Sequence, residues 1–292
     1  MKLLLAIDSS KGSQTAVDEV AARPWPAGST VDVVSVVEPA HLWTMSITSE
    51  EASRRAKELV ERAAAQLRSG GLTARGLTMA GDPKTLILDR LKESGADLAV
   101  LGSHGVSAVA RFLLGNVAAS VARHAPCSVE IVRASKSGPP ARKLLLATDA
   151  SECSIAAASS IASRPWPKGT QVRVLSVVEF YLPTAQALLE PPFIPSSQIP
   201  ALREEAMKHA QDAVAGAMEQ LTPTQIQLSE SISVLLKSPK SVILEEASQW
   251  GADLIVVGSH GRRGLERFLL GSVAESVATH AECSVEVIRR SM

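Results

Sequence analysis

Two glycine-rich segments carry the residues best suited to chemistry, because they share one spacing. The second reads Gly258-Ser-His-Gly261, nine further residues, then Gly271-Ser272, and the first reads Gly102-Ser-His-Gly105, nine further residues, then Gly115-Asn116. Glycines let backbone amides approach a phosphate closely. A helix is predicted after the last glycine, with Ser272 as its N-cap and an N-terminal end that attracts anions. Each segment is therefore predicted to bind an anion.

Short apolar runs around these segments predict the strands that position them. They are Leu3–Ile7, Val31–Val37, Leu98–Leu101 and Val129–Val132. Each run is unbroken rather than alternating, which is typical of parallel strands covered on both faces. Between the runs, the apolar spacing of 50–67 predicts a helix that ends at Gly70-Gly71, and Pro83 is suited to begin another over 83–91.

The chain contains one pattern twice. Lys2–Asp8 returns as Lys143–Asp149, 141 residues later, and Gly102–Gly105 returns as Gly258–Gly261, 156 residues later. The second copy is therefore 15 residues longer, most visibly in the proline-rich segment 180–200. Because its prolines exclude a helix or a central strand, this segment predicts a long loop, placed to cover the second site as a lid.

These patterns predict an α/β fold of two tandem doubly wound domains. Each domain is expected to hold an open five-stranded parallel sheet with helices on both faces. Domain 1 spans 1–134, an exposed linker rich in Ser, Gly and Pro spans 135–142, and domain 2 spans 143–292. In such sheets ligands bind beyond the carboxyl ends of the strands, where Asp8 and Asp149 follow the first strand of each copy.

Composition excludes several classes of function. The 30 basic and 30 acidic residues balance, so the chain lacks the bulk positive charge of a nucleic-acid or anionic-membrane binder. No apolar stretch approaches the roughly 20 residues that span a bilayer. The three cysteines form no disulfide framework, which favours a cytoplasmic location. The sequence contains no dedicated metal-ligand cluster and no complete catalytic constellation.

The glycine segments, the first-strand aspartates and the closing segments His124-Ala-Pro-Cys-Ser-Val-Glu and His280-Ala-Glu-Cys-Ser-Val-Glu resemble the universal stress protein family in its tandem form. The resemblance implies Rossmann-like domains of the adenine-nucleotide alpha-hydrolase type and an ATP-binding stress-response regulator. The implied second site comprises Ala147, Thr148, Asp149, Val177, Val257, Gly258, Gly261, Arg262, Gly271, Ser272 and Val273. The implied first site comprises Asp8, Val36, Leu101, Gly102, Gly105, Gly115 and Asn116.

The same resemblance implies how the copies associate. The last strands, Ser128–Val132 and Ser284–Ile288, are expected to pair about a pseudo-twofold axis, and a homodimer of the whole chain is compatible with this pairing. The protein that such a regulator would act on is not identified by the sequence. A Mg or Mn ion is expected to bridge the nucleotide phosphates, because few other groups neutralise a triphosphate.

Purely structural roles for the polar residues stay open. Asp8 and Asp149 are also typical N-caps of the helices that follow them. His104 and His260 have no paired carboxylate or nucleophile near them in sequence, which favours a loop-ordering or phosphate-contact role over catalysis.

The two copies are not expected to bind equally. Asn116 stands where the second copy has Ser272, and the first glycine segment carries fewer cations, so binding is expected to be tighter in the second copy. Two rival functions remain: a slow ATPase in which Asp149 or a metal-held water attacks the terminal phosphate, and a nucleotide-free interaction scaffold.

Overall fold

The fold is taken from a computed structural model of the chain. It describes residues 1–39, 48–105, 114–134, 138–179, 199–224, 226–235, 238–261 and 270–290. Strands and helices alternate through these ranges. The predicted α/β fold class is therefore confirmed.

Ten strands form one sheet in the order β3-β2-β1-β4-β5-β10-β9-β6-β7-β8. The first half contains β1 (Lys2–Ala6), β2 (Thr30–Val37), β3 (Thr73–Ala80), β4 (Leu98–Gly102) and β5 (Ser128–Val132). The second half contains β6 (Lys143–Ala147), β7 (Gln171–Glu179), β8 (Gln227–Leu235), β9 (Leu254–Gly258) and β10 (Ser284–Ile288). Within each half every pair is parallel, and the strand order reverses beside β1 and β6.

The described helices begin and end close to where the sequence signals them. They are α1 (Lys11–Ala22), α3 (Ser49–Ser69), α4 (Pro83–Ser94), α5 (Asn116–His124), α6 (Glu152–Ala162), α7 (Ile199–Leu221), α8 (Pro239–Trp250) and α9 (Ser272–His280). Gly70 is the C-cap of α3, and Pro83 occupies the first turn of α4, as predicted. None of these helices is long and apolar enough to cross a membrane.

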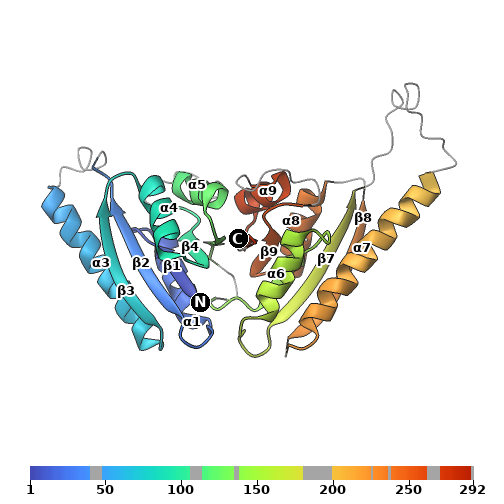
Figure 1. Ribbon diagram of the computed structural model, residues 1–292, viewed down its shortest axis with the longest axis horizontal. Coiled ribbons are helices and arrows are strands. Elements are labelled where there is room, and N and C mark those ends of the chain that lie inside the picture. The colour runs from blue at the N-terminus through green and yellow to red at the C-terminus, as the bar shows by residue number, and fades with distance from the viewer. Residues whose placement is uncertain are drawn as a thin grey trace, which may run out of the picture.

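The two halves join through β5 and β10, which pair antiparallel (Figure 1). Glu130 lies opposite Glu286 in this register, and the two occupy the same position in their copies. A twofold operation between them therefore relates the halves, and the last strands pair as predicted. In Figure 1, α3 and α7 lie at the outer ends and α5 and α9 lie side by side at the centre.

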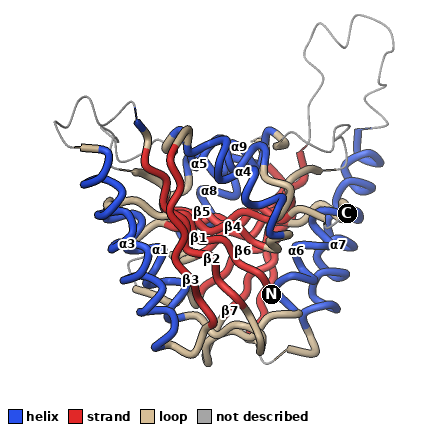
Figure 2. The backbone as a smooth tube through the Cα atoms, turned by 60° about the vertical axis from the view of Figure 1, so that its left-hand side comes forward, coloured by secondary structure: helices blue, strands red, loops and turns tan. Residues whose placement is uncertain are grey.

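The helices cover the two faces of the sheet differently, as Figure 2 shows from another side. On one face a single hydrophobic core runs across both halves and includes Leu91 of α4, Val121 of α5, Ile243 of α8 and Val277 of α9. On the opposite face, α1 and α3 form one core with the first half, and α6 and α7 form a separate core with the second half. The halves therefore share a core on one face only.

An ionic cluster of Glu19, Arg23, Glu130, Arg164 and Glu286 lies buried where α1 and α6 face the last strands, and each of its members is at most 7% exposed. Arg23 donates to Glu130 at 2.6 and 2.8 Å and to Glu19 at 2.7 and 3.1 Å. Arg164 donates to Glu286 at 2.9 Å. Because successive side chains of β5 and β10 point to opposite faces of the sheet, their glutamates point away from the shared core.

Two expectations about connecting segments need correction. The proline-rich segment was expected to remain a loop to residue 200, but α7 begins at Ile199, since a proline is tolerated in the first turn of a helix. Residues 180–198, and with them the predicted lid, lie outside the described residues. The described end of the linker is not fully exposed: Ala141 is 3% exposed, and its N–H donates to Glu19 at 3.0 Å. The domain limits at 134 and 143 stay predictions.

Candidate functional site

The predicted residues of the first half gather at the carboxyl edge of the sheet. Ala6, at the end of β1, lies opposite Leu101 of β4. Ile7 N donates to Val34 O of β2 at 2.8 Å, so the chain beyond β1 stays in register with β2 as it reaches Asp8. The ends of β1, β2 and β4 therefore meet around this aspartate.

The second half repeats this arrangement. Ala147 of β6 lies opposite Val257 of β9, and Thr148 N donates to Leu175 O of β7 at 2.9 Å. Ala147 and Thr148 are 8% and 7% exposed, whereas Asp149 is only partly buried. The apolar strand therefore ends by presenting its carboxylate at the sheet edge.

Asp8 orders the turn that leads into α1. Its Oδ1 accepts from Ser10 N at 2.9 Å and from Ser13 Oγ at 2.7 Å. The N-cap of α1 is Ser10, whose Oγ accepts from Ser13 N at 3.2 Å. The interpretation of Asp8 as the helix cap is therefore wrong, since a serine two residues later already has that role.

Asp149 repeats one of these contacts before α6, whereas Ser154 Oγ, the equivalent of Ser13 Oγ, donates to Ser151 O at 3.0 Å instead. Its Oδ1 accepts from Ser151 N at 3.0 Å, and Ser151 is the N-cap that accepts from Ser154 N at 3.3 Å. Thr148 Oγ1 donates to Ser154 Oγ at 3.2 Å, which adds a polar contact beneath the turn. The cap interpretation is therefore wrong for this aspartate as well.

The second oxygen of each aspartate faces a glycine of the predicted anion-binding segment. A Cβ added at Gly105 would lie 2.6 Å from Oδ2 of Asp8, and one added at Gly261 would lie 2.7 Å from Oδ2 of Asp149. Both separations are shorter than a van der Waals contact, so any other residue would displace the carboxylate. The structure thus brings the first-strand aspartate and the glycine segment together in both halves.

Two serines outside the predicted site residues also hold the glycine segments. Ser10 Oγ donates to His104 O at 3.2 Å, and Ser151 Oγ donates to His260 O at 3.2 Å. A single serine therefore caps a helix and ties the glycine segment to it. The repeat contained a signal for this role, because Ser10 and Ser151 are equivalent at the same offset as the aspartates.

The first glycine of each segment packs against the start of the neighbouring helix. A Cβ at Gly102 would lie 2.6 Å from the carbonyl carbon of Gly12, and one at Gly258 would lie 2.8 Å from Cys153 Cβ. These glycines therefore allow close packing of the strand end on the neighbouring helix. Their predicted contact with phosphate stays a prediction.

The helix after each segment begins one residue earlier than the capping argument assumed. Gly115 is the N-cap of α5 and Gly271 is the N-cap of α9, and neither provides a side-chain cap. Ser272 and Asn116 are the first helical residues and are exposed, so the prediction that Ser272 caps the helix is wrong. A Cβ added at Gly271 would lie only 3.0 Å from Ser259 O. A glycine therefore suits this cap position better than a residue with a side chain.

This correction leaves the anion-binding argument intact. The first intrahelical bond of α9 runs from Glu275 N to Gly271 O at 2.9 Å. The amides of Ser272, Val273 and the residue after it therefore have no acceptor within the helix. Such amides, at the positive end of a helix, are the donors that bind phosphate in other nucleotide sites.

The remaining predicted residues form an apolar wall beside the aspartates. Val36 of β2 and Val177 of β7 are partly buried against the shared core. Leu101 and Val257 are 3% and 5% exposed within the same core. The side chains of Leu101 and Val257 pack inward, and their strands pair with a neighbour on each side. Arg262 lies outside the described residues.

The histidines of the segments are held by their own neighbours. Nδ1 of His104 lies 2.9 Å from Ser103 Oγ, and Nδ1 of His260 lies 3.2 Å from Ser259 Oγ. Nε2 of His104 is buried without a hydrogen-bond partner. This geometry favours a loop-ordering role over catalysis, as the sequence indicates. In the described part of the chain, no group of three or more His, Cys, Asp or Glu side chains is arranged to hold a metal ion.

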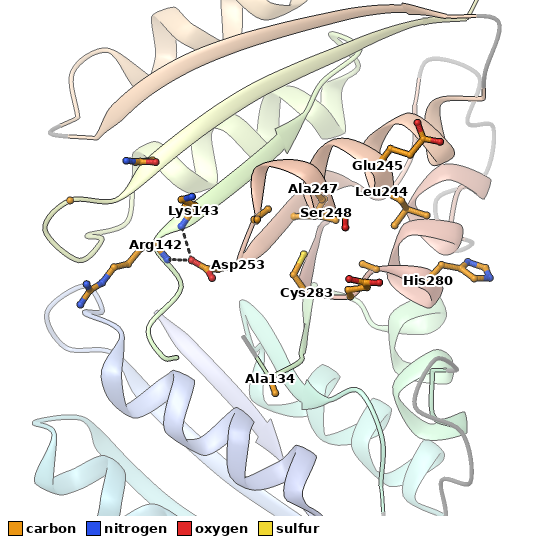
Figure 3. Close-up of a pocket in the computed structure, with 17 residues that line it drawn as sticks. Ala134, Arg142, Lys143, Leu244, Glu245, Ala247, Ser248, Asp253, His280 and Cys283 are labelled. Carbon is orange, nitrogen blue, oxygen red and sulfur yellow. Dashed lines mark hydrogen bonds between the residues drawn. The ribbon is translucent and has the colours of Figure 1, made fainter. Parts of the chain in front are cut away.

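A hollow of about 610 Å³ lies at the opposite edge of the second half, where its strands begin (Figure 3). Asp253 projects there and accepts from the backbone N–H groups of Arg142 and Lys143 at 3.0 Å. Asp97 makes the same type of contact with Lys2 N at 2.7 Å in the first half. These aspartates therefore fasten the start of a strand, and the hollow lies away from the predicted site.

The sequence matches the universal stress protein family over residues 1–133 and again over 140–289. The chain belongs to this family. The match covers both copies of the repeat, so the tandem form inferred from the internal pattern is confirmed.

Individual members of the universal stress protein family resemble the chain over much of its length. A universal stress protein of Mycobacterium tuberculosis is 32% identical over 202 residues, which cover 67% of this chain and 63% of the relative. The match thus spans less than two thirds of that relative. A universal stress protein of Mycolicibacterium smegmatis is 27% identical over 299 residues, covering 98% of this chain and 96% of the relative.

Solved structures share the whole fold of the chain. The crystal structure of a universal stress protein from Archaeoglobus fulgidus superposes with a TM-score of 0.67 at 20% identity, covering 99% of this chain and 98% of that one. A functionally unknown protein from Pseudomonas aeruginosa superposes with a TM-score of 0.65 at 18% identity, covering 99% and 92%. At these identities the comparison establishes the tandem Rossmann-like architecture.

Proposed function

We propose that the protein is a cytoplasmic, ATP-binding stress-response regulator with its main nucleotide site in the second half. One observation carries this proposal: Oδ2 of Asp149 faces the bare backbone of Gly261, while Gly271 leaves the first amides of α9 without a side-chain cap. A carboxylate suits ribose hydroxyls, and uncapped helix amides suit phosphate oxygens. The two groups together fit a nucleotide better than a simple anion.

The apolar strand ends complete the proposed pocket. Val177 is partly buried at the end of β7, next to β6 and its aspartate, which is the position expected for backbone contact with adenine. Bound ATP would bring a triphosphate, and a Mg or Mn ion would neutralise part of its charge. The protein would contribute the backbone amides of Ser272 and Val273 to the phosphates. Arg262 remains a candidate phosphate contact.

The first half would bind the same class of ligand more weakly. It repeats the contact between Asp8 and Gly105 and the uncapped helix start at Gly115. Asn116 replaces Ser272 there, and an amide is bulkier than a hydroxyl beside a phosphate. A regulated partner protein and a homodimer belong to this proposal as well, with nucleotide occupancy as the signal.

Denaturing the purified chain and identifying any released nucleotide by mass tests the proposal. Gly271→Val and Gly115→Val are matched variants. The new Cβ would lie 3.0 Å from Ser259 O in the first and 3.3 Å from Ser103 O in the second. ATP is expected at up to two per chain, with the larger loss in Gly271→Val. An empty protein that also gives no calorimetric signal with ATP and magnesium would favour the nucleotide-free scaffold.

The same samples distinguish a regulator from a slow ATPase. Incubation of the chain with ATP and magnesium should release no phosphate above that of Gly271→Val. Phosphate release that disappears in Asp149→Ala while ATP binding is retained would instead identify an enzyme. Asp149 is the test residue because its Oδ2 lies at the proposed ribose and phosphate side of the pocket.

A further inference from the structure

Arg133 follows β5 in the first half, but its side chain lies against α9 of the second half. Its Nη2 donates to Ala278 O at 2.6 Å, and Nη1 donates to Cys283 O at 3.4 Å. Its own N–H donates to Ser284 Oγ at 3.0 Å, which anchors the backbone across the joint. Arg133 therefore caps the carboxyl end of a helix that belongs to the other half.

Arg289 follows β10 and makes the reciprocal contact with α5. Its Nη2 donates to Ala122 O at 2.7 Å and to Arg123 O at 2.9 Å, and Nη1 donates to Cys127 O at 3.4 Å. Arg289 N donates to Ser128 Oγ at 3.1 Å. The two arginines are thus exchanged between the halves by the same twofold relation that pairs the last strands.

These contacts are made by charged side chains that are partly buried. Burial lowers the pKa of Arg133 to about 10, and it also lowers the pKa of Arg289. Among the described residues, the Arg133 guanidinium donates to backbone carbonyl oxygens rather than to a carboxylate. At neutral pH both guanidiniums stay charged, which suits the negative end of a helix dipole. An ion pair therefore does not explain why the Arg133 side chain lies against the second half.

The helices that receive these arginines are the ones that begin at the proposed phosphate amides. Helix α9 begins at Ser272 and ends at His280, and α5 begins at Asn116 and ends at His124. Nine residues span roughly 13 Å, so the arginine and the proposed phosphate lie at opposite ends of one short rod. A contact that fixes one end of such a rod also fixes the direction of the other.

We propose that Arg133 and Arg289 are positioning residues for the nucleotide site of the opposite half. The inference rests on the proposed nucleotide function. Each arginine would act on the site at the far end of the helix that it contacts, and not on the site of its own half.

The test is calorimetry with ATP and magnesium on full-length chains that keep one site each. Gly115→Val leaves the second-half site, and Gly271→Val leaves the first-half site. Arg133→Met is expected to weaken the second-half site about tenfold and to leave the first-half site unchanged. Arg289→Met should give the reverse pattern. Arg133→Lys should recover most of the loss, because lysine keeps the charge and can reach a carbonyl oxygen.

Arg68→Met is the matched control, since Arg68 also donates to a carbonyl oxygen, Ala74 O at 2.9 Å, but within α3 and β3. It should change neither site. Hydrogen exchange on the nucleotide-free chains gives an independent readout: Arg133→Met should raise exchange in α9 and not in α5. A general loss of folding would raise both.

The outcomes separate the two proposals. Weakening confined to an arginine's own half, equal weakening of both sites, or unchanged affinity with unchanged α9 exchange would overturn the positioning role while ATP binding stands. Absence of ATP binding in the unsubstituted chain would refute the proposed function, and the positioning role for that ligand would fall with it.

Discussion

Glu130 and Glu286 lie directly opposite each other at the centre of the antiparallel pair that joins the two halves. Like charges in this position destabilise a sheet, and these side chains are only 1% and 0% exposed. Arg23 and Arg164 compensate the charge, each donating to one of the glutamates. The joint between the halves therefore depends on buried ion pairs as well as on the shared core.

The two arginines at this joint should differ in what their removal costs. Arg23 bonds Glu130 and Glu19, and although burial alone would lower its pKa, these carboxylates hold that pKa above its ordinary value. Arg23→Met leaves two buried carboxylates unpaired and is expected to lower the free energy of unfolding by about 4 kcal/mol. Arg164→Met breaks one pair and should cost about 2 kcal/mol. Urea denaturation measures both.

The asymmetry has a cause that the sequence shows. The position equivalent to Glu19 in the second copy is Ser160, so Arg164 lacks a second carboxylate, and its Nη1 is buried without a partner. Arg54→Met is the control, because Arg54 pairs with Glu51 and Glu58 on the exposed surface, where an ion pair adds little to stability. Equal losses for the two buried arginines would contradict this account.

The repeat and the apolar runs were sufficient to predict the architecture. Strand limits such as Val31–Val37 agree with β2 within one residue, since an unbroken β-branched run has few alternatives. The partnership of Asp8 with Gly105 followed from strand order, because carboxyl ends of adjacent parallel strands share an edge. These features depend on local pattern and on topology.

Other features depend on contacts between distant segments, which no local pattern encodes. Arg23 begins the segment Arg-Pro-Trp-Pro, whose local pattern gives no sign that its side chain is 4% exposed and bonds Glu130, 107 residues away. The exchange of Arg133 between halves is of the same kind. Capping preferences predict Ser272 as the N-cap of α9, whereas Gly271 occupies that position, where an added Cβ would lie 3.0 Å from Ser259 O.

Ser151 offers a test of how the second glycine segment is held. Removing its hydroxyl in Ser151→Ala breaks the bond to His260 O and the cap of α6. ATP affinity at the second-half site should fall about fivefold, which corresponds to about 1 kcal/mol for one hydrogen bond. Ser159→Ala is the control on the same helix, because Ser159 is exposed and remote from the segment. Calorimetry that gives equal affinities for both variants would count against this role.

Gly261 should tolerate no side chain, although it is exposed. Gly261→Ala places a methyl group 2.7 Å from Oδ2 of Asp149 and forces the carboxylate to move. Nucleotide binding at the second-half site is expected to fall at least tenfold, with little change in unfolding free energy. Gly216→Ala, inside α7 with open space around it, should instead stabilise the fold by about 0.5 to 1 kcal/mol. If Gly261→Ala binds nucleotide as well as the unsubstituted chain, Asp149 does not belong to the nucleotide site.

The three thiols should react in a fixed order. Cys127 and Cys283 are 8% and 9% exposed, and burial raises the pKa of each thiol from 9.0 to about 11. Cys153 is only partly buried in the first turn of α6. Iodoacetamide at pH 7.5 should therefore modify Cys153 alone, as peptide mass analysis can show. Early modification of Cys127 or Cys283 would indicate opening of the joint between the halves.

The same two thiols predict an alkaline loss of stability. Because their pKa is higher in the folded chain, folding retains two protons that the unfolded chain releases above pH 9.0. Their contribution is complete below pH 9.0 and is lost as pH rises toward 11. Urea denaturation from pH 8 to 11 should show this decline, and Cys127→Ala with Cys283→Ala should flatten it, although both substitutions lower stability at neutral pH. A decline as steep in the double variant would assign it to other groups.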